Sequence, residues 1–135
     1  MNFELHPRLA NGSFHLGRIA GSHLLLKNNA LFPWFLLVPE TDAEDLHELA
    51  PDHYTAVYEA IRQISIFVKE EFKPERLNVG YISLIVRQLH MHIVGRSSTD
   101  PAWPAGVWGF EGKELYTEAE VERIRAAARK ALPLE

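Results

Sequence analysis

The stretch Gln88-Leu89-His90-Met91-His92-Ile93-Val94-Gly95-Arg96 is the most informative part of this sequence, because polar and apolar residues alternate along its first half. Side chains two positions apart on a β-strand point to the same face of the sheet. Leu89, Met91 and Ile93 are therefore expected to face a core, and His90 and His92 to point together to the other side, where Gln88 also lies. Two neighbouring imidazoles can divide labour, one as nucleophile and one as proton donor or acceptor.

Two other interpretations of this pattern stay open. The histidines can simply form the polar face of a half-exposed strand. They can also chelate a metal, since two imidazoles on one strand suit zinc, but zinc then needs a third ligand. Spacing places none of the remaining histidines beside this pair; they are His6, His15, His23, His47 and His53.

The rest of the chain predicts an α+β domain, because strands do not alternate regularly with helices. Apolar residues at three- and four-residue steps predict a long helix from Pro51 that ends before Pro74. Thr117 and Glu120 form a capping box at the start of a C-terminal helix over 117–132. A short helix is expected over 41–49. Alternating or apolar runs predict strands at 14–19, 23–27, 31–38, 77–86 and 89–94.

Composition narrows the classes of function. The 135 residues suit one domain over 1–135, and the formal net charge of −4 argues against a broad nucleic-acid surface. A mildly acidic chain can still bind one small anion through helix ends and backbone amides. There is no cysteine, and we see no signal peptide or apolar run long enough for a membrane helix. We therefore expect a cytoplasmic protein without membrane or nucleic-acid partners.

At this point the sequence resembles a known family. The motif from Gln88 to Arg96 resembles the histidine triad (HIT) motif, His-x-His-x-His-x-x-Pro-Arg, and the likeness extends from about Phe3 to Gly109. The runs 24–29 and 32–39 look like the family's strand, Asn/Asp turn and second strand. The segment Asp100-Pro-Ala-Trp-Pro, with Val-Trp-Gly at 107–109, looks like the tail of a bacterial branch that carries Q-L-H-x-H, similar to diadenosine polyphosphate hydrolases.

The position of the arginine sets the register of this resemblance. In the family the arginine follows the last histidine by four residues, as Arg96 follows His92. His92 therefore corresponds to the last histidine and His90 to the middle one, which is the family's nucleophile, while Gln88 replaces the first.

The resemblance implies a HIT-like fold, a five-stranded antiparallel sheet with one long and one C-terminal helix. Two such subunits usually form a homodimer with a ten-stranded sheet. It also implies that His90 attacks the α-phosphate of a purine nucleotide derivative and that His92 hydrogen-bonds the phosphate and assists the leaving group. Water then releases the nucleoside monophosphate. Dinucleoside polyphosphates, nucleotide phosphoramidates and adenylylated small molecules are the candidate substrates, and no metal or other cofactor is expected.

Further site residues are candidates on chemical grounds. Asn28 is the first choice for the ribose hydroxyls, because one amide can both donate and accept hydrogen bonds. Asn29 is the second choice, and both can instead be simple turn residues. Arg96 can stabilise phosphate charge or solvate a strand end, and the second role is favoured. Ser83 is a candidate for phosphate contact.

The sequence departs from the family pattern near the phosphate. Family members usually carry Gly followed by Asn or Gln where this chain has Ser83-Leu84-Ile85, and Leu84 has no side-chain donor. Gly95 stands in place of the motif's proline. An alternative to the hydrolase or transferase is therefore a catalytically weak or inactive nucleotide-binding dimer. A metal-dependent enzyme on the His-x-His pair is a third hypothesis.

Overall fold

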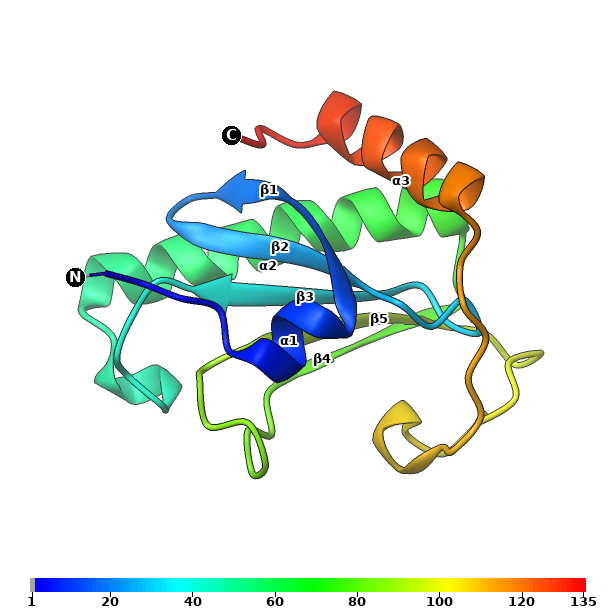
Figure 1. Cartoon of the computed structure of the whole chain (residues 1–135), viewed down its shortest axis with the longest axis horizontal. Helices are drawn as coiled ribbons and strands as arrows, with labels where there is room; N and C mark the ends of the chain where they lie inside the picture. The colour runs from blue at the N-terminus through cyan, green and yellow to red at the C-terminus, as the bar shows by residue number, and fades with distance from the viewer. Residues whose placement is uncertain (1) are drawn as a thin grey trace.

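The computed structural model describes residues 2–135, which fold around a single antiparallel sheet (Figure 1). Its five strands run in the order β1-β2-β3-β5-β4. The strands are β1 (Ser13–Ile19), β2 (Ser22–Lys27), β3 (Trp34–Pro39), β4 (Arg76–Gly80) and β5 (Met91–Arg96). The expected α+β class with a five-stranded antiparallel sheet is confirmed.

The helices divide between the two faces of the sheet. The long helix α2 (Pro51–Phe72) and the C-terminal helix α3 (Glu118–Ala131) pack on one face, where they form the larger apolar core with side chains from the strands. The short helix α1 (Pro7–Asn11), which the sequence did not predict, packs with the loop around Val107 on the other face. In Figure 1, α2 lies behind the sheet and α1 lies in front.

Several local predictions are confirmed. The strands expected at 14–19 and 23–27 are β1 and β2, and they form a hairpin whose turn residues Ala20 and Gly21 both have positive φ. Helix α2 has Pro51 in its first turn and ends at Phe72, and its C-cap Lys73 directly precedes Pro74. The capping box at Thr117 is present at the start of α3. All residues of β3 are buried, as expected for the central strand.

Three predictions were wrong in the type or the bounds of the element. The strand expected over 77–86 ends at Gly80, which pairs with His92, and residues 81–90 form an irregular loop in which Ser83 has φ 51°. Beyond Gly80 the loop side chains have no sheet to cover, and Leu84 remains 82% exposed. The helix expected over 41–49 is a single 3₁₀ turn, Leu46–Glu48. The strand expected at 89–94 begins two residues later, at Met91.

Candidate active site around His90 and His92

His92 lies on β5, and His90 directly precedes this strand. Because the two residues are two positions apart on an extended chain, both side chains point to the face opposite α2. Leu89, Met91 and Ile93 are buried in the core on the helix side, as their alternation predicted. The ring centroids of His90 and His92 lie 5.0 Å apart. The predicted division of this segment into an apolar face and a histidine face is therefore confirmed.

The two imidazoles open into a cavity of about 340 Å³ between the irregular loop and Trp108. His90 and His92 are themselves only 6% and 7% exposed. Most of the remaining wall is apolar, and it consists of Ile82, Ser83, Leu84, Ile85, Val86 and Trp108. The cavity is large enough for a small ligand group next to the histidines.

A backbone carbonyl determines which ring nitrogen of His90 carries the proton. Its Nδ1 lies 2.7 Å from the carbonyl oxygen of Gln88. A carbonyl only accepts hydrogen bonds, so Nδ1 carries the proton and Nε2 keeps its lone pair. Burial lowers the pKa of His90, although the Gln88 carbonyl opposes this shift. A neutral imidazole with a free Nε2 is the nucleophilic form of the side chain.

His92 faces a different partner. The indole Nε1 of Trp34 lies 3.0 Å from Nδ1 of His92, and both side chains are buried. Burial lowers the pKa of His92 to about 3, and the nearby charges of His90 and Lys27 act in the same direction. Lys27 itself lies over the Trp34 ring, with its Nζ 4.9 Å from the ring centroid.

Trp34 and Lys27 are the members of this cluster that the sequence analysis missed. The strand register aligns Leu25 of β2, Leu36 of β3 and His92 of β5 in one row across the sheet. Lys27 lies two residues after Leu25 and Trp34 lies two residues before Leu36, so both share the face of that row. Their places on two expected strands were visible in the sequence, but the pairing of the strands was not.

Gln88 does not line the cavity. Its side-chain Nε2 donates to the carbonyl of Glu4 at 2.8 Å, and its Oε1 accepts from the backbone amide of His6 at 2.8 Å. It therefore ties the N-terminal segment to the loop that precedes β5.

Asn28 and Asn29 contact the segment that leads to α3. The Asn28 Oδ1 accepts from the amide of Tyr116 at 3.0 Å, and the Asn29 Oδ1 accepts from Leu31 and Glu114 at 3.2 and 3.3 Å. Neither residue is among those that line the cavity.

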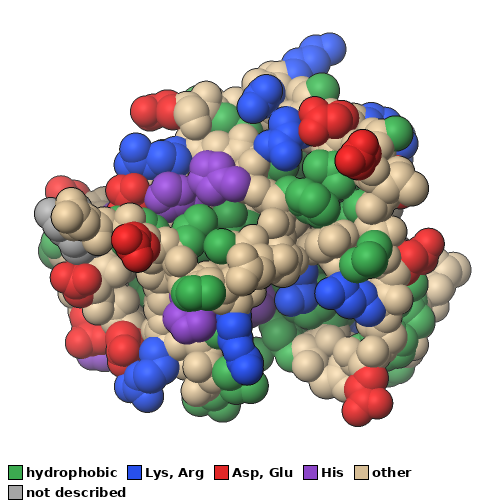
Figure 2. Space-filling model, viewed as in Figure 1, with side chains coloured by type: hydrophobic (Ala, Val, Ile, Leu, Met, Phe, Trp, Pro, Cys, Tyr) green, Lys and Arg blue, Asp and Glu red, His purple; other side chains and the backbone are tan. Residues whose placement is uncertain are grey.

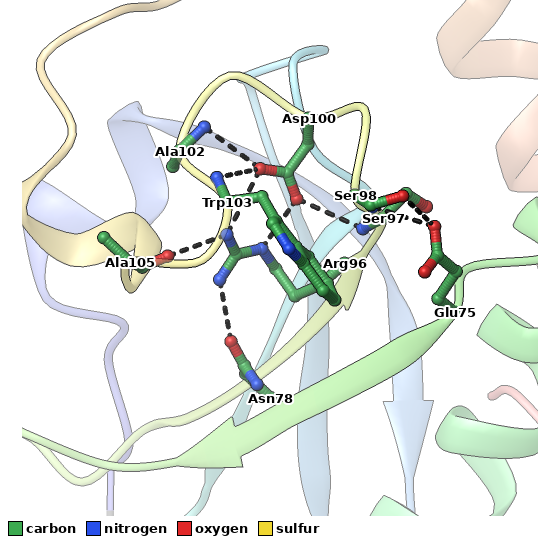
Figure 3. A network of polar contacts seen from close by, with 9 residues as sticks. All are labelled: Glu75, Asn78, Arg96, Ser97, Ser98, Asp100, Ala102, Trp103 and Ala105. Atoms are coloured by element: carbon green, nitrogen blue, oxygen red, sulfur yellow. Dashed lines mark hydrogen bonds and ion pairs between the residues drawn. The ribbon is translucent and has the colours of Figure 1, made fainter.

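Arg96 is enclosed in a polar network rather than exposed at a strand end. Its guanidinium donates to the Asp100 carboxylate at 2.8 and 3.2 Å, to Asn78 Oδ1 at 2.9 Å and to the Ala105 carbonyl at 2.8 Å (Figure 3). Its side chain is 4% exposed. Arg96 lines a separate, smaller cavity with Trp103 and does not line the histidine cavity.

Two of the other histidines form a separate pair. His15 and His23 hydrogen-bond to each other at 2.8 Å, and His23 also contacts Glu40 at 3.0 Å. Among residues 2–135, no group of three or more His, Asp or Glu side chains is arranged to hold a metal ion. On the face seen in Figure 2, histidines appear in separate places, with acidic and basic side chains near them.

Comparison with known proteins identifies the class. A HIT domain profile matches residues 11–99. Three solved structures resemble this chain over nearly its whole length. A histidine triad protein from Sinorhizobium meliloti is 31% identical with a TM-score of 0.93, over 97% of this chain and 98% of that one. One from Bradyrhizobium japonicum is 32% identical with a TM-score of 0.94, over 98% and 99%.

The third, a histidine triad protein from Marinobacter aquaeolei, is 32% identical with a TM-score of 0.91, over 96% of each chain. The chain therefore belongs to the HIT family, as its motif suggested. The sequence gives no significant match to a curated protein. Within residues 2–135, no helix is both long and apolar enough to cross a membrane.

Proposed function

We propose that this protein is a hydrolase or transferase that cleaves a nucleoside phosphate derivative at its α-phosphate, through a nucleotidyl-histidine intermediate on His90. The observation that carries the proposal is the contact between His90 Nδ1 and the Gln88 carbonyl, because it leaves Nε2 as a free nucleophile at the cavity. Substrates of this kind are dinucleoside polyphosphates, nucleotide phosphoramidates and adenylylated small molecules, with a purine base.

The chemistry proceeds in two displacements. In the first, the lone pair of His90 Nε2 forms a bond to the α-phosphorus, and the bond to the leaving group breaks with its electron pair. The phosphorylated imidazole then carries a positive charge, which the Gln88 carbonyl stabilises through Nδ1–H. In the second, water attacks phosphorus and loses a proton, and the electron pair of the P–N bond returns to Nε2.

The loop before β5 has backbone amides available for the phosphate oxygens. In this described segment, none of the amides of residues 83–88 donates to a carbonyl or side chain of the chain. The Ser83 hydroxyl is also buried without a partner. For the ribose, Asn28 remains the first candidate and Asn29 the second; the Asn29 Nδ2 contacts the Gly112 carbonyl at 3.5 Å.

A second candidate function is a nucleotide-binding protein with little or no turnover. Leu84 and Ile85 favour it, because they are 82% and 79% exposed beside the histidines and offer no side-chain donor. Loss of one oriented donor can cost about 2.7–4 kcal/mol of transition-state stabilisation. In this case the phosphate binds, but the developing charge is less well stabilised.

The deciding experiment measures AMP release from diadenosine polyphosphates, an AMP phosphoramidate and AMP-lysine, with excess chelator present. We expect turnover by the wild type and a loss of at least about a thousandfold in His90→Ala, because the covalent step needs the nucleophile. Thermal stabilisation by AMP without turnover would favour the binding protein. Turnover that chelator abolishes would favour the metal-dependent alternative.

We also propose a homodimer in which the β4 strands of two copies pair into a ten-stranded sheet. β4 is an edge strand, and its Val79 is 43% exposed. Tyr54 and Tyr58 on α2 are 41% and 40% exposed. Sedimentation should give a dimer for the wild type and a monomer for Val79→Lys, since a lysine on the strand edge opposes pairing. A monomeric wild type would contradict this proposal.

A further inference from the structure

Trp34 donates its indole N–H to a ring nitrogen of His92. We propose that Trp34 is a positioning residue, which keeps His92 neutral with its single proton on Nε2, aimed at the phosphate. Its importance for the reaction rests on the proposed function, but the proton position itself does not. Trp34 and His92 come from adjacent strands, β3 and β5, and are 58 positions apart in the chain.

The first step of the argument is the chemistry of the indole. An indole N–H can only donate a hydrogen bond. Because Trp34 Nε1 lies 3.0 Å from His92 Nδ1, this ring nitrogen must present a lone pair. A neutral imidazole carries one proton, so it resides on Nε2. A second proton on Nδ1 would place two N–H groups against each other in a buried site.

The second step is the environment of the pair. Trp34 is 5% exposed and His92 is 7% exposed, so water does not readily replace the indole as a partner. The charged and titratable groups around His92 are His90 on its own segment and Lys27 on β2. Trp108 meets the His92 ring edge-on, with centroids 5.4 Å apart. In the part of the chain that the structure describes, no carboxylate hydrogen-bonds to His92 to favour a second proton.

The third step is the contrast with His90. The Gln88 carbonyl requires a proton on Nδ1 of His90, and the Trp34 indole excludes one from Nδ1 of His92. The two imidazoles therefore have opposite tautomers. His90 presents a lone pair at Nε2, and His92 presents an N–H at Nε2. The pair divides into a nucleophile and a hydrogen-bond donor without any change of charge.

This assignment changes the role of His92 in the first displacement. A neutral imidazole N–H donates a hydrogen bond to a phosphate oxygen, but it does not give up its proton near neutral pH. An amine or alkoxide leaving group therefore takes its proton from solvent and not from His92. His92 stabilises the negative charge on the phosphate through its N–H. It also positions the α-phosphorus for attack by Nε2 of His90.

The first test uses ¹⁵N NMR of the histidine rings in the wild type, with the His92 signals assigned by their absence in His92→Asn. We expect Nδ1 of His92 to show the shift of an unprotonated nitrogen, and Nε2 that of a protonated one, from pH 5 to pH 8. A proton on Nδ1, or rapid averaging of the two tautomers, would overturn the proposal. This measurement requires no substrate and no change at Trp34.

The second test compares Trp34→Phe with Trp108→Phe, since both indoles contact the His92 ring but only Trp34 donates to it. We expect Trp34→Phe to release the His92 tautomer and raise its pKa, and Trp108→Phe to leave the His92 ring shifts unchanged. In turnover, Trp34→Phe should lower kcat about three- to tenfold, with little change in KM and a shifted acid limb of the pH profile.

The outcomes separate the two proposals. Unchanged His92 shifts and an unchanged pH profile in folded Trp34→Phe would overturn the role of Trp34, even if the wild type is an active hydrolase. A fixed tautomer in a wild type that turns over no substrate supports the tautomer assignment and counts against the proposed function.

Discussion

The two ends of β5 differ in how completely their polar side chains are paired. At the end near Arg96, the guanidinium makes four hydrogen bonds, and Asp100 also accepts from three backbone amides, those of Ser97, Ala102 and Trp103. At the other end, His90 and His92 each have one ring nitrogen held by the protein and the other directed to a cavity.

The contrast separates two kinds of buried polar group on one strand. A buried guanidinium with four of its five N–H donors used holds a loop in place and has one donor left for a ligand. A buried imidazole with one nitrogen held and one open is oriented and still able to react. Arg96, which the motif made a candidate for phosphate contact, belongs to the first kind, and the histidines belong to the second.

The largest effect on stability is expected at the Arg96 end of β5, where the polar groups are paired. Arg96→Met keeps much of the side-chain volume but leaves Asp100 buried without its counter-charge. We expect the free energy of unfolding to fall by about 3–5 kcal/mol. Urea denaturation measures it. Lys69→Met is the control, because the Lys69 ammonium contacts only backbone carbonyls near the surface. A loss in Arg96→Met below about 1 kcal/mol would contradict the structural role.

The next largest effect is the pH dependence of stability that His92 causes at the histidine end of β5. The folded pKa of His92 is about 3, below the ordinary value of 6.5 that applies in the unfolded chain. The unfolded state therefore binds more protons below pH 6.5, and stability falls as the pH falls from 6.5 toward 3.

For His92 alone, this loss amounts to roughly 2 kcal/mol between pH 6.5 and 4.5. Urea denaturation across this range should show a shallower pH dependence in His92→Asn than in the wild type, whatever its absolute stability. Equal slopes in the two proteins would show that His92 does not supply the effect.

Gly95 tests the packing of β5 directly beside Arg96. A Cβ at this position would lie 2.7 Å from Pro33 Cγ and 3.2 Å from Pro74 Cβ, and both belong to rigid rings. We expect Gly95→Ala to lower the melting temperature, with a cost of about 1–3 kcal/mol from overpacking. Gly80→Ala is the control, because a Cβ there meets nothing within 4 Å. Equal melting temperatures of the two variants would contradict the close packing.

The smallest effect is expected from adding a hydrogen-bond donor for the phosphate beside His90 and His92. Leu84→Gln places an amide beside the histidines at a side chain that is 82% exposed, so the fold should tolerate it. We expect turnover of the AMP phosphoramidate to rise by about tenfold, which is part of the effect of one oriented donor. Ile85→Gln, one position further along the same loop, is the matched control. A lack of any gain would mean that Leu84 does not limit the rate.

Much of the fold was predictable because its signals are local. The helix α2 follows from apolar steps between two prolines, and α3 from its capping box. Residues 81–86 of the loop were mispredicted as strand because they are β-prone. The end of pairing at Gly80 depends on the register with β5, which no local pattern contains. The position of Arg96 was missed for the same reason, since its partners Asn78 and Ala105 lie in other segments.

The sequence by itself determined that His90 and His92 share a face opposite the core, because alternation on a strand is a property of the chain alone. It also indicated the family through the spacing to Arg96. Only the tertiary structure decided where each imidazole keeps its proton. That choice depends on an indole 58 positions from His92 and on a carbonyl whose direction depends on the loop before β5. Hydrogen-bond partners are set by positions in space, and residues far apart in the chain become neighbours only when the sheet forms.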